Sequence, residues 1–332
     1  MMNIKFEVIS PEQVSNVHPI LASSHFGPYR YLIHQDKEHY MRYWLEEISQ
    51  SARNPSCDLL VALQDGRMVG LVVMDELPWD SQLFQLPMCK ISELVLDNQD
   101  ESLSELSNLL VSRAIQWARE RKYEFMLCKT YTDDVVNMHA LEHAGFLLVD
   151  TLLYYFVDFR RNLWSSIPKQ IAEDGVTIRL AKPEDEAELV QMMHLSFQHH
   201  MGRYHSDPNI NSDQATKVYE QWVLSSLAGY ADFFVLAEIN KRIVGLSIWK
   251  KPSDLEQQLP VKIGHYSIGA VHPDFYGRKL FTLLSYEGMR LIKDNVDGIQ
   301  MPTHINNYPV QRGIIKLGGR LVDAQHSFHK WL

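Results

Sequence analysis

Residues 58–74 read DLLVALQDGRMVGLVVM, an apolar run, a polar turn and a second apolar run. Residues 232–249, DFFVLAEINKRIVGLSIW, repeat this pattern in the second half of the chain. Two apolar runs of strand length joined by a short polar turn are typical of a β-hairpin. Gly70 and Gly245 occupy the same place in the two segments, at a separation of 245 − 70 = 175 residues. The sequence therefore predicts the same hairpin twice.

The repeat extends over other segments at nearly the same offset. The matching pairs are LPMCKISELVL (86–96) with LPVKIGHYSIGAV (259–271), YMRYWLEEI (40–48) with VYEQWVLSSL (218–227), and LEHAGFLLVD (141–150) with IIKLGGRLVD (314–323). A repeat this long indicates two homologous domains rather than a solenoid. We predict domains at 1–160 and 176–332, joined by a linker at 161–175 where polar and turn residues accumulate.

Each half is predicted to contain the same order of elements. An early amphipathic helix and an aromatic-rich helix precede the hairpin, and a further strand and a long helix follow it. Another strand, a short helix ending at glycine, and final strands complete the unit. The long helices are expected at 106–121 and 280–294, and the strands after them at 123–131 and 298–305. This order predicts an α/β fold with a mixed sheet in each half.

The composition is ordinary for a globular protein, with 45% hydrophobic and 22% charged residues in a chain of 332. The net charge of −9 argues against a nucleic-acid partner, because contacts with phosphate backbones need a basic face. Small anionic ligands are not excluded, since they need only a few local cations. The three cysteines form no CxxC pair, which favours a reducing compartment. With neither a secretory signal nor a long apolar run, we expect a cytoplasmic protein without a membrane span.

The order of hairpin, strand, turn, long helix, strand and short helix closed by glycine resembles that of the GNAT acyltransferases. Residues 140–151, ALEHAGFLLVDT, resemble the closing helix and strand of that family. Residues 269–284, GAVHPDFYGRKLFTLL, resemble its coenzyme A motif. The resemblance covers nearly the whole chain as a tandem of two domains. It implies transfer of an acyl group, acetyl or a short hydroxyacyl, from acyl-coenzyme A to an amine.

A narrower resemblance concerns the acceptor. Residues 77–87 (LPWDSQLFQLP), the segment 192–222 and the terminal SFHKWL are similar to parts of the TDP-fucosamine N-acetyltransferase family. This similarity implies that the small-molecule partner is a dTDP-linked deoxyamino sugar used for cell-surface polysaccharide such as O-antigen. Two alternatives stay open at this point. One is an acyltransferase for another small-molecule or protein amine, and the other is a catalytically silent pair of ligand-binding domains.

The pyrophosphate of coenzyme A needs backbone N–H donors at a helix N-terminus, where the helix dipole favours negative charge. The family loop reads Arg/Gln-x-x-Gly-x-Gly/Ala, and only Gly277 matches a glycine, because Lys279 and Phe281 stand where small residues are usual. The predicted loop residues are Tyr276, Gly277, Arg278, Lys279, Leu280 and Phe281. Arg278 and Lys279 would supply positive charge, and an ordinary turn into a helix is the alternative reading.

The corresponding segment of the first half, LDNQDESLSELSNLL (96–110), has no glycine and several acids. Carboxylates there would repel phosphate, so we expect the first domain to be degenerate and the single active site to lie in the second. Backbone N–H groups near Gly269, Ala270 and Val271 are candidates to hold the developing oxyanion. Gly269 would permit a close approach, and a glycine packed against a helix is the alternative.

The family often protonates the leaving thiolate with a tyrosine four residues before the helix-terminal glycine. That position is Ile314, before Gly318, so the usual acid is missing. The candidate catalytic residues are therefore Tyr308, His304 and His265, with bulk or ordered water as an alternative base. Any single histidine among them has the alternative of a purely structural role.

The acceptor is expected to lie against the segment HHMGRYHSDPN (199–209) and the aromatic helix after it. The candidate residues are Arg203, Tyr204, His205, Asp207, Tyr219 and Trp222, with Asn306 for the acceptor and Asn307 for the pantetheine amides. Arg203 is suited to a diphosphate, and an aromatic ring to stacking on a nucleobase. A solvated loop with a core-facing aromatic stripe is the alternative. Trp79 and Asp80 are comparable candidates in the first half.

A metal site is not expected. Residues 139–143, HALEH, satisfy the H-x-x-E-H pattern of one zinc-peptidase class, but the matching GIIKL in the second half has no ligands. The histidines between 194 and 205 lack ligand spacing with cysteines or acids.

Overall fold

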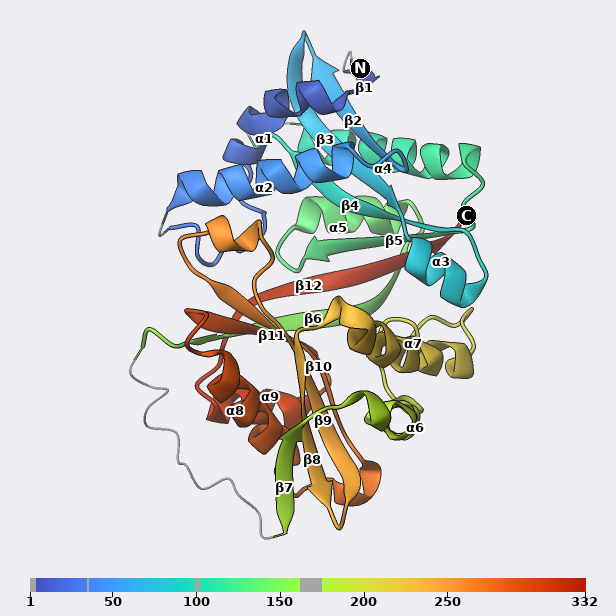
Figure 1. The fold of residues 1–332 in the computed structure, drawn as a ribbon. Coiled ribbons are helices and arrows are strands. Elements are labelled where there is room, and N and C mark those ends of the chain that lie inside the picture. The colour runs from blue at the N-terminus through green and yellow to red at the C-terminus, as the bar shows by residue number, and fades with distance from the viewer. Residues whose placement is uncertain (1–3, 35, 99–101, 162–174) are drawn as a thin grey trace. The chain divides into compact units, whose positions relative to one another are not determined.

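The computed structural model describes residues 4–34, 36–98, 102–161 and 175–332. The chain divides into two compact units, one formed by Met1–Asp150 with Ala324–Leu332 and the other by Thr151–Asp323. The linker predicted at 161–175 falls, apart from its two end residues, outside the described residues. Across the described ranges, no helix combines the length and apolar character that crossing a membrane requires. Figure 1 shows the elements in chain order.

The first unit is a mixed sheet flanked by helices. Its elements are β1 (Ile4–Val8), α1 (His18–Ser23), α2 (Lys37–Ala52), β2 (Cys57–Gln64), β3 (Arg67–Glu76), α3 (Pro78–Phe84), β4 (Met88–Leu96), α4 (Leu103–Glu120), β5 (Phe125–Tyr131) and α5 (Val135–His143). The strand order is β1-β2-β3-β4-β5-β12, in which β12 (Arg320–Trp331) comes from the end of the chain. The strands β1 to β4 pair antiparallel, β4 and β5 pair parallel, and β5 pairs antiparallel with β12.

The second unit repeats this plan. Its elements are β6 (Leu147–Asp158), β7 (Val176–Leu180), α6 (Glu186–Phe197), α7 (Ser212–Ser225), β8 (Phe233–Ile239), β9 (Arg242–Lys250), β10 (Ile263–Val271), α8 (Leu280–Ile292), β11 (Gly298–His304) and α9 (Tyr308–Lys316). The strand order is β6-β11-β10-β9-β8-β7, with β10 and β11 parallel. The predicted α/β class with a mixed sheet is confirmed.

The two halves exchange their last strands. β6 follows the first half in sequence, yet from Leu152 to Asp158 it pairs with β11 of the second unit. β12 ends the second half, and its residues 325–331 pair with β5 of the first unit. The expectation that each half is completed by its own final strand is therefore wrong for these pairings. Backbone hydrogen bonds are generic, so either strand can complete either sheet edge.

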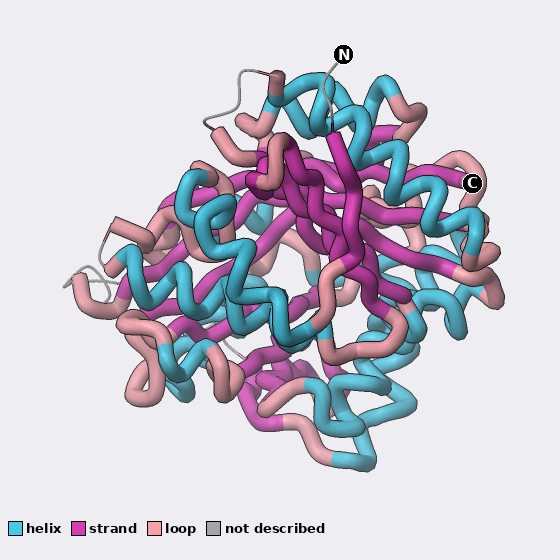
Figure 2. The backbone as a smooth tube through the Cα atoms, turned by 90° about the horizontal axis from the view of Figure 1, so that it is seen from above, coloured by secondary structure: helices cyan, strands magenta, loops and turns pink. Residues whose placement is uncertain are grey.

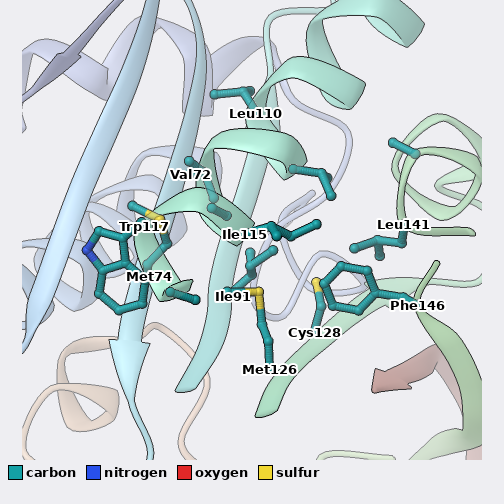
Figure 3. Packing of buried hydrophobic residues seen from close by; sticks show 14 of the residues in the cluster. Val72, Met74, Ile91, Leu110, Ile115, Trp117, Met126, Cys128, Leu141 and Phe146 are labelled. Carbon is teal, nitrogen blue, oxygen red and sulfur yellow. The ribbon is translucent and has the colours of Figure 1, made fainter. Parts of the chain in front are cut away.

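Buried apolar residues cover both faces of the first sheet. Within α4, the buried residues recur at helical spacing and form one apolar stripe: Leu106, Leu110, Val111, Ala114, Ile115 and Ala118. Figure 3 shows Ile115 of α4 near Ile91 of β4, and Trp117 of α4 beside Met74 of β3. A second cluster, which includes Trp44 of α2, covers the opposite face. The helices thereby fix the position of β4 and β5.

Helices also cover both faces of the second sheet. In Figure 1, α8 and α9 lie on one side of the strands β7 to β10, and α6 and α7 lie on the other. Figure 2 shows helices flanking the strands in a perpendicular view. Apolar residues of α6 and α7 pack on Ile268 and Ala270 of β10, which assigns this face of β10 to the α6 and α7 side. We call it the α7 face of the second unit, and the opposite one its α8 face.

Candidate active site

The loop between β10 and α8 has a backbone shape that leaves a helix N-terminus accessible. A turn at Pro273–Phe275 leads to Tyr276, whose side chain is 62% exposed. Gly277 follows with φ +81°, and no atom lies within 4 Å of the place that a Cβ would take. The helix then starts at Leu280 after Lys279, whose side chain does not cap it. The first N–H groups of a helix have no partner within the helix, so this end is suited to an anion.

Lys279 adopts the left-handed backbone conformation that glycine favours, with φ +60°. The loop therefore keeps a shape suited to two glycines although only Gly277 is present. Phe281, at the other position where a small residue is usual, turns its ring toward Tyr266, with centroids 6.0 Å apart. The Arg278 guanidinium lies 5.5 Å from the centroid of the Phe275 ring. Positive charge and backbone donors thus meet on this loop.

The corresponding loop of the first unit lies partly outside the described residues, which stop at Asn98 and resume at Ser102. Asp97, just before this gap, is buried and forms an ion pair of 3.1 Å with Arg67. α4 then begins at Leu103, and Ser102 provides no side-chain cap. Asp97 is therefore ion-paired with an arginine of its own unit.

The strands β10 and β11 separate toward their C-terminal ends. In the described residues they pair at Ile263, Gly264 and His265 with residues 298–300, whereas β10 continues to Val271 and β11 to His304. The pairing of β10 with β9 also shifts between Tyr266 and Ile268, so Ser267 is the extra residue of a β-bulge. The C-terminal half of β10 leads directly into the loop and contacts α8.

Gly269 serves the packing of Tyr266. A Cβ at Gly269 would lie 1.7 Å from the Tyr266 hydroxyl, so only glycine leaves space for this ring. Burial raises the pKa of Tyr266, whose side chain is 5% exposed. The residues that follow Gly269 on β10 are Ala270, which is buried, and Val271, which is half-buried. The Val271 carbonyl accepts a hydrogen bond from Ser196 Oγ at 3.2 Å. The packing of Tyr266 on the α8 face thus explains why residue 269 is a glycine.

His265 forms a close pair with an acid. Its Nε2 lies 2.7 Å from Oε1 of Glu256, a residue in the loop between β9 and β10 that is 9% exposed. Its position is the last one at which β10 pairs with β11. Side chains alternate along a strand, so His265 lies on the opposite face from Gly264 and Tyr266, which is the α7 face. A histidine held by a carboxylate where the strands separate has the arrangement of a general base.

His304 is held in a defined tautomer at the end of β11. It is 8% exposed, and its Nδ1 accepts a hydrogen bond from the Asn306 backbone N–H at 3.0 Å. A neutral imidazole with an accepting Nδ1 carries its proton on Nε2 and is a hydrogen-bond donor there. Asn307 precedes α9 without capping it through its side chain. Tyr308 begins α9 and is 58% exposed, whereas Ile314 is fully buried.

Aromatic rings and imidazoles gather around Tyr219 of α7, and we call Phe197, His200, His205, Tyr219 and His304 the Tyr219 cluster. Phe197 stacks on Tyr219 with centroids 4.0 Å apart. The centroid of His200 lies 5.3 Å from that of Tyr219 and 6.4 Å from that of His304. The cluster therefore links the predicted acceptor segment to the end of β11 within the second unit.

His205 contributes an acceptor atom to the cluster. Thr216 Oγ1 donates to the Ser212 carbonyl at 3.0 Å, so it accepts from Nε2–H of His205, 3.2 Å away. Burial lowers the pKa of His205, which favours its neutral form. The remaining nitrogen, Nδ1, is buried and has no hydrogen-bond partner among the described residues. A buried acceptor without a partner is suited to a donor group of a ligand.

The other residues predicted on this loop have varied surroundings. Arg203 is half-buried and donates from Nη2 to the Tyr204 hydroxyl at 3.1 Å, with its guanidinium 4.6 Å from the centre of that ring. Tyr204 is 3% exposed and Asp207 is 1% exposed. Asp207 Oδ1 accepts from the Asn209 backbone N–H at 2.9 Å, which closes a turn. Tyr204 and Asp207 therefore help to shape the loop that carries Arg203.

Three contributors to this site were missed at the level of sequence. Trp222 was predicted, but its partner was not: the indole N–H donates to Ser267 Oγ at 3.2 Å. Ser267 has a counterpart in Ser92, 267 − 92 = 175 residues earlier, so the repeat offset could have revealed it. Glu256 and Thr216 had no such signal, because each acts through a loop or a helix turn that brings it to a histidine.

The remaining predicted residues lie elsewhere. Trp79 and Asp80 are on α3 of the first unit, with Trp79 38% exposed and Asp80 buried. His139 and His143, from the zinc-peptidase pattern, lie on α5 with ring centroids 6.5 Å apart. In the part of the chain that the structure describes, no group of three or more His, Cys, Asp or Glu side chains is placed to hold a metal ion.

No family model and no curated protein matches the sequence, but solved structures match the fold. The tandem GNAT protein from the clavulanic acid biosynthesis pathway covers 99% of this chain and 98% of its own, with a TM-score of 0.61 and 13% identity. The chain has the tandem GNAT fold. A GCN5-related N-acetyltransferase from Sphaerobacter thermophilus aligns over 99% and 95% of the two chains at a TM-score of 0.63 and 12% identity. An acetyltransferase of the GNAT family from Colwellia psychrerythraea aligns over 99% and 100% at 0.52 and 10%.

The GNAT fold accounts for the shared plan of the two units. The tandem arrangement predicted from the sequence repeat is confirmed, because these neighbours match the chain from end to end. At 13% and 12% identity, the likeness concerns the backbone, so the chemistry has to be argued from the side chains of this chain.

Proposed function

We propose that the chain is an acyl-coenzyme A-dependent N-acyltransferase whose second unit acts on the amino group of a dTDP-linked deoxyamino sugar. The observation that carries the proposal is the joint placement of the Gly277 to Lys279 loop and His265 at the two ends of β10. The neighbours with the same fold are named as N-acetyltransferases, which supports acetyl-coenzyme A as the donor. A short hydroxyacyl donor is an alternative with the same chemistry.

The loop residues fit a pyrophosphate. Gly277 leaves open space beside the backbone, and α8 begins without a side-chain cap. Backbone N–H groups of residues 277–281 would hold the phosphates, with Arg278 and Lys279 adding positive charge. Acyl-coenzyme A supplies the activated thioester when it is bound. The start of α9, with Asn307, is the proposed contact for its pantetheine amides.

The histidines divide the remaining tasks by their hydrogen bonds. His265 accepts the proton of the attacking amine, because its carboxylate partner stabilises the charged imidazolium. His304 donates from Nε2–H toward developing negative charge, since its Nδ1 is already occupied. His205 offers a buried acceptor to the sugar nucleotide. Tyr308 is exposed, so it would protonate the thiolate only from the surface, where water serves the same purpose.

The acceptor is proposed to lie along the α7 face. Its diphosphate would meet Arg203, and its base or sugar would lie against Tyr219 and Trp222, with Asn306 nearby. The sequence resemblance of residues 192–222 to nucleotide-sugar acyltransferases supports this choice. Replacing Arg203 by Ala should raise KM for the nucleotide sugar roughly 10-fold and leave KM for acyl-coenzyme A unchanged. The exposed Arg290→Ala on α8 is the control, and an unchanged KM in Arg203→Ala would exclude this loop as the diphosphate site.

One observation favours a second candidate function, a silent ligand-binding pair of domains. Ile314 is fully buried where a catalytic tyrosine is usual. A thiol-release assay with acetyl-coenzyme A separates the two proposals when run with dTDP-amino sugars, free amino sugars and a lysine peptide. The enzyme proposal predicts release that is fastest with the dTDP-amino sugars. Absence of release with every amine, together with absence of a thermal shift with coenzyme A, would contradict it.

A further inference from the structure

We propose that Glu256 is a positioning residue that orients His265 and fixes its tautomer, and this inference rests on the proposed function. The carboxylate accepts the Nε2–H of His265, which leaves the Nδ1 lone pair to receive the proton of the amine. Nothing in the sequence pattern marks Glu256, because it lies in the loop between β9 and β10, nine positions before His265.

The carboxylate is itself held in place at both oxygens. Oε1 contacts His265 Nε2 at 2.7 Å, and Oε2 accepts the backbone N–H of Ser253 at 2.7 Å. The backbone N–H of Glu256 in turn donates to Ser253 Oγ at 3.3 Å. The residue is 9% exposed, so solvent exchanges little with either contact. A buried acid with a fixed orientation transmits that orientation to the imidazole.

The position of His265 gives this orientation a chemical consequence. His265 is the last residue of β10 that pairs with β11, and Ser267, two residues later, is the bulge that Trp222 contacts. Its neighbours on the adjacent strands are Lys250 of β9 and Gln300 of β11. The ammonium of Lys250 lies 3.7 Å from the centre of the Tyr230 ring. Unlike these two neighbours, Glu256 is an acid, and its carboxylate is the group hydrogen-bonded to Nε2 of His265.

The acyl-transfer step forms one bond and breaks another. The amine nitrogen forms a bond to the carbonyl carbon, and the carbon–sulfur bond breaks with its electrons on sulfur. The amine proton goes to Nδ1 of His265, and the positive charge is shared with the Glu256 carboxylate across Nε2. The thiolate takes a proton from water, and His265 returns its proton to solvent. Glu256 keeps its hydrogen bond to Nε2 throughout and exchanges no atom with either substrate.

The test compares Glu256→Gln with Asp254→Asn, a change in an exposed acid of the same loop. We expect Glu256→Gln to lower kcat about 10- to 100-fold without raising KM for acetyl-coenzyme A. Asp254→Asn should leave both quantities unchanged. Glu256→Asp, with a shorter carboxylate, should recover part of the loss.

A double variant shows whether Glu256 acts through His265. In a His265→Gln background, the additional Glu256→Gln change should cost less than twofold in kcat, whereas independent roles would multiply the losses. The ¹⁵N chemical shifts of the His265 ring in the folded full-length chain report its tautomer without any activity, and Glu256→Gln should weaken the preference for the Nε2–H form. An unchanged tautomer, or losses that multiply, would overturn the inference while turnover by the wild type leaves the proposed function standing. Absence of turnover in the wild type would remove both.

Discussion

The two units share a bulged strand of the same geometry, but this strand carries different side chains in each unit. β4 and β10 are each bulged at a serine, Ser92 and Ser267, and each pairs with its parallel neighbour only over its first residues. The residue after the bulge is Glu93 in the first unit and Ile268 in the second. The position of His265 corresponds to Lys90, 265 − 90 = 175 residues earlier. The fold thus provides the geometry twice, and the side chains decide where chemistry can follow.

The first unit places an acid where the second has an isoleucine. Partial burial and the nearby Glu47 carboxylate raise the pKa of Glu93 to about 8. Tyr43 donates to Glu47 at 2.7 Å, so that acid has a partner on its own helix. At neutral pH Glu93 therefore holds its proton and behaves as a neutral residue. The comparison shows one carboxyl whose pKa is raised by its surroundings in the first unit and one that is hydrogen-bonded to a histidine in the second.

The largest expected effect comes from replacing the proposed general base of the second unit. His265→Gln should lower kcat by roughly 10²- to 10⁴-fold, the usual contribution of a positioned base. Lys90→Gln, the same change at the corresponding position of the first unit, should leave kcat within about twofold. Steady-state rates of thiol release measure both. Equal losses in the two variants would mean that the chemistry is not confined to the second unit.

The next effect concerns the pH dependence of stability. Because the folded state raises the pKa of Glu93 above its ordinary 4.5, it holds the proton more tightly than the unfolded chain. This contribution to the free energy of unfolding is fully present below about pH 4.5 and is lost as pH rises from there through about 8, by an amount on the order of 5 kcal/mol. Urea unfolding of Glu93→Gln at several pH values should show a flatter dependence. The exposed Glu38→Gln should retain the wild-type slope, and a wild-type slope in Glu93→Gln would contradict this account.

A smaller effect tests the phosphate loop. Gly277→Val forces an L side chain into a left-handed backbone, and we expect it to weaken coenzyme A binding about 10-fold. Gly66→Val is a matched control in the first unit, because Gly66 has the same φ of +81° and equally open surroundings. Both variants should lose about 1 kcal/mol of stability from backbone strain. Calorimetric titration with coenzyme A should separate them, and similar affinities in both would remove the loop from the site.

The smallest effect tests the second left-handed residue of the loop. Lys279→Gly should raise the free energy of unfolding by about 1 kcal/mol and keep coenzyme A affinity within about threefold, since the backbone supplies the main donors. Lys122→Gly, at φ +61° in the first unit, should give the same stabilisation. A loss of affinity well beyond threefold in Lys279→Gly would show that the ammonium, rather than the backbone, holds the phosphates.

Local patterns were sufficient to predict the elements. The two apolar runs joined by a polar turn in 58–74 and 232–249 predicted both hairpins, and the helical spacing of apolar residues predicted α4 and α8. The exchange of β6 and β12 was not predictable in this way. Neither LLVDTLLYYFVD in β6 nor RLVDAQHSFHKW in β12 contains a local signal that specifies which sheet edge the strand completes. Pairing between distant strands depends on tertiary structure rather than on the pattern of either strand.

For the candidate site too, individual residues could be predicted from the sequence, whereas the contacts between them could not. His205 was predicted from the segment before the aromatic helix, Tyr219 and Trp222 from that helix, and His304 from the segment PTHINNYPVQ. The structure brings His205, Tyr219 and His304 into one cluster. Their hydrogen-bond partners were not predicted, because a contact such as Thr216 with His205 depends on how a loop meets a helix. Those partners assign the tautomers, and so the roles that we propose for the histidines.

The central claim is that acyl transfer belongs to the second unit. Thiol release from acetyl-coenzyme A with a dTDP-amino sugar, measured for the wild type, His265→Gln and Lys90→Gln, tests it most directly. We predict release by the wild type and Lys90→Gln at similar rates, and a rate at least ~100-fold lower for His265→Gln. Loss in Lys90→Gln with retention in His265→Gln would place the chemistry in the first unit and contradict the account.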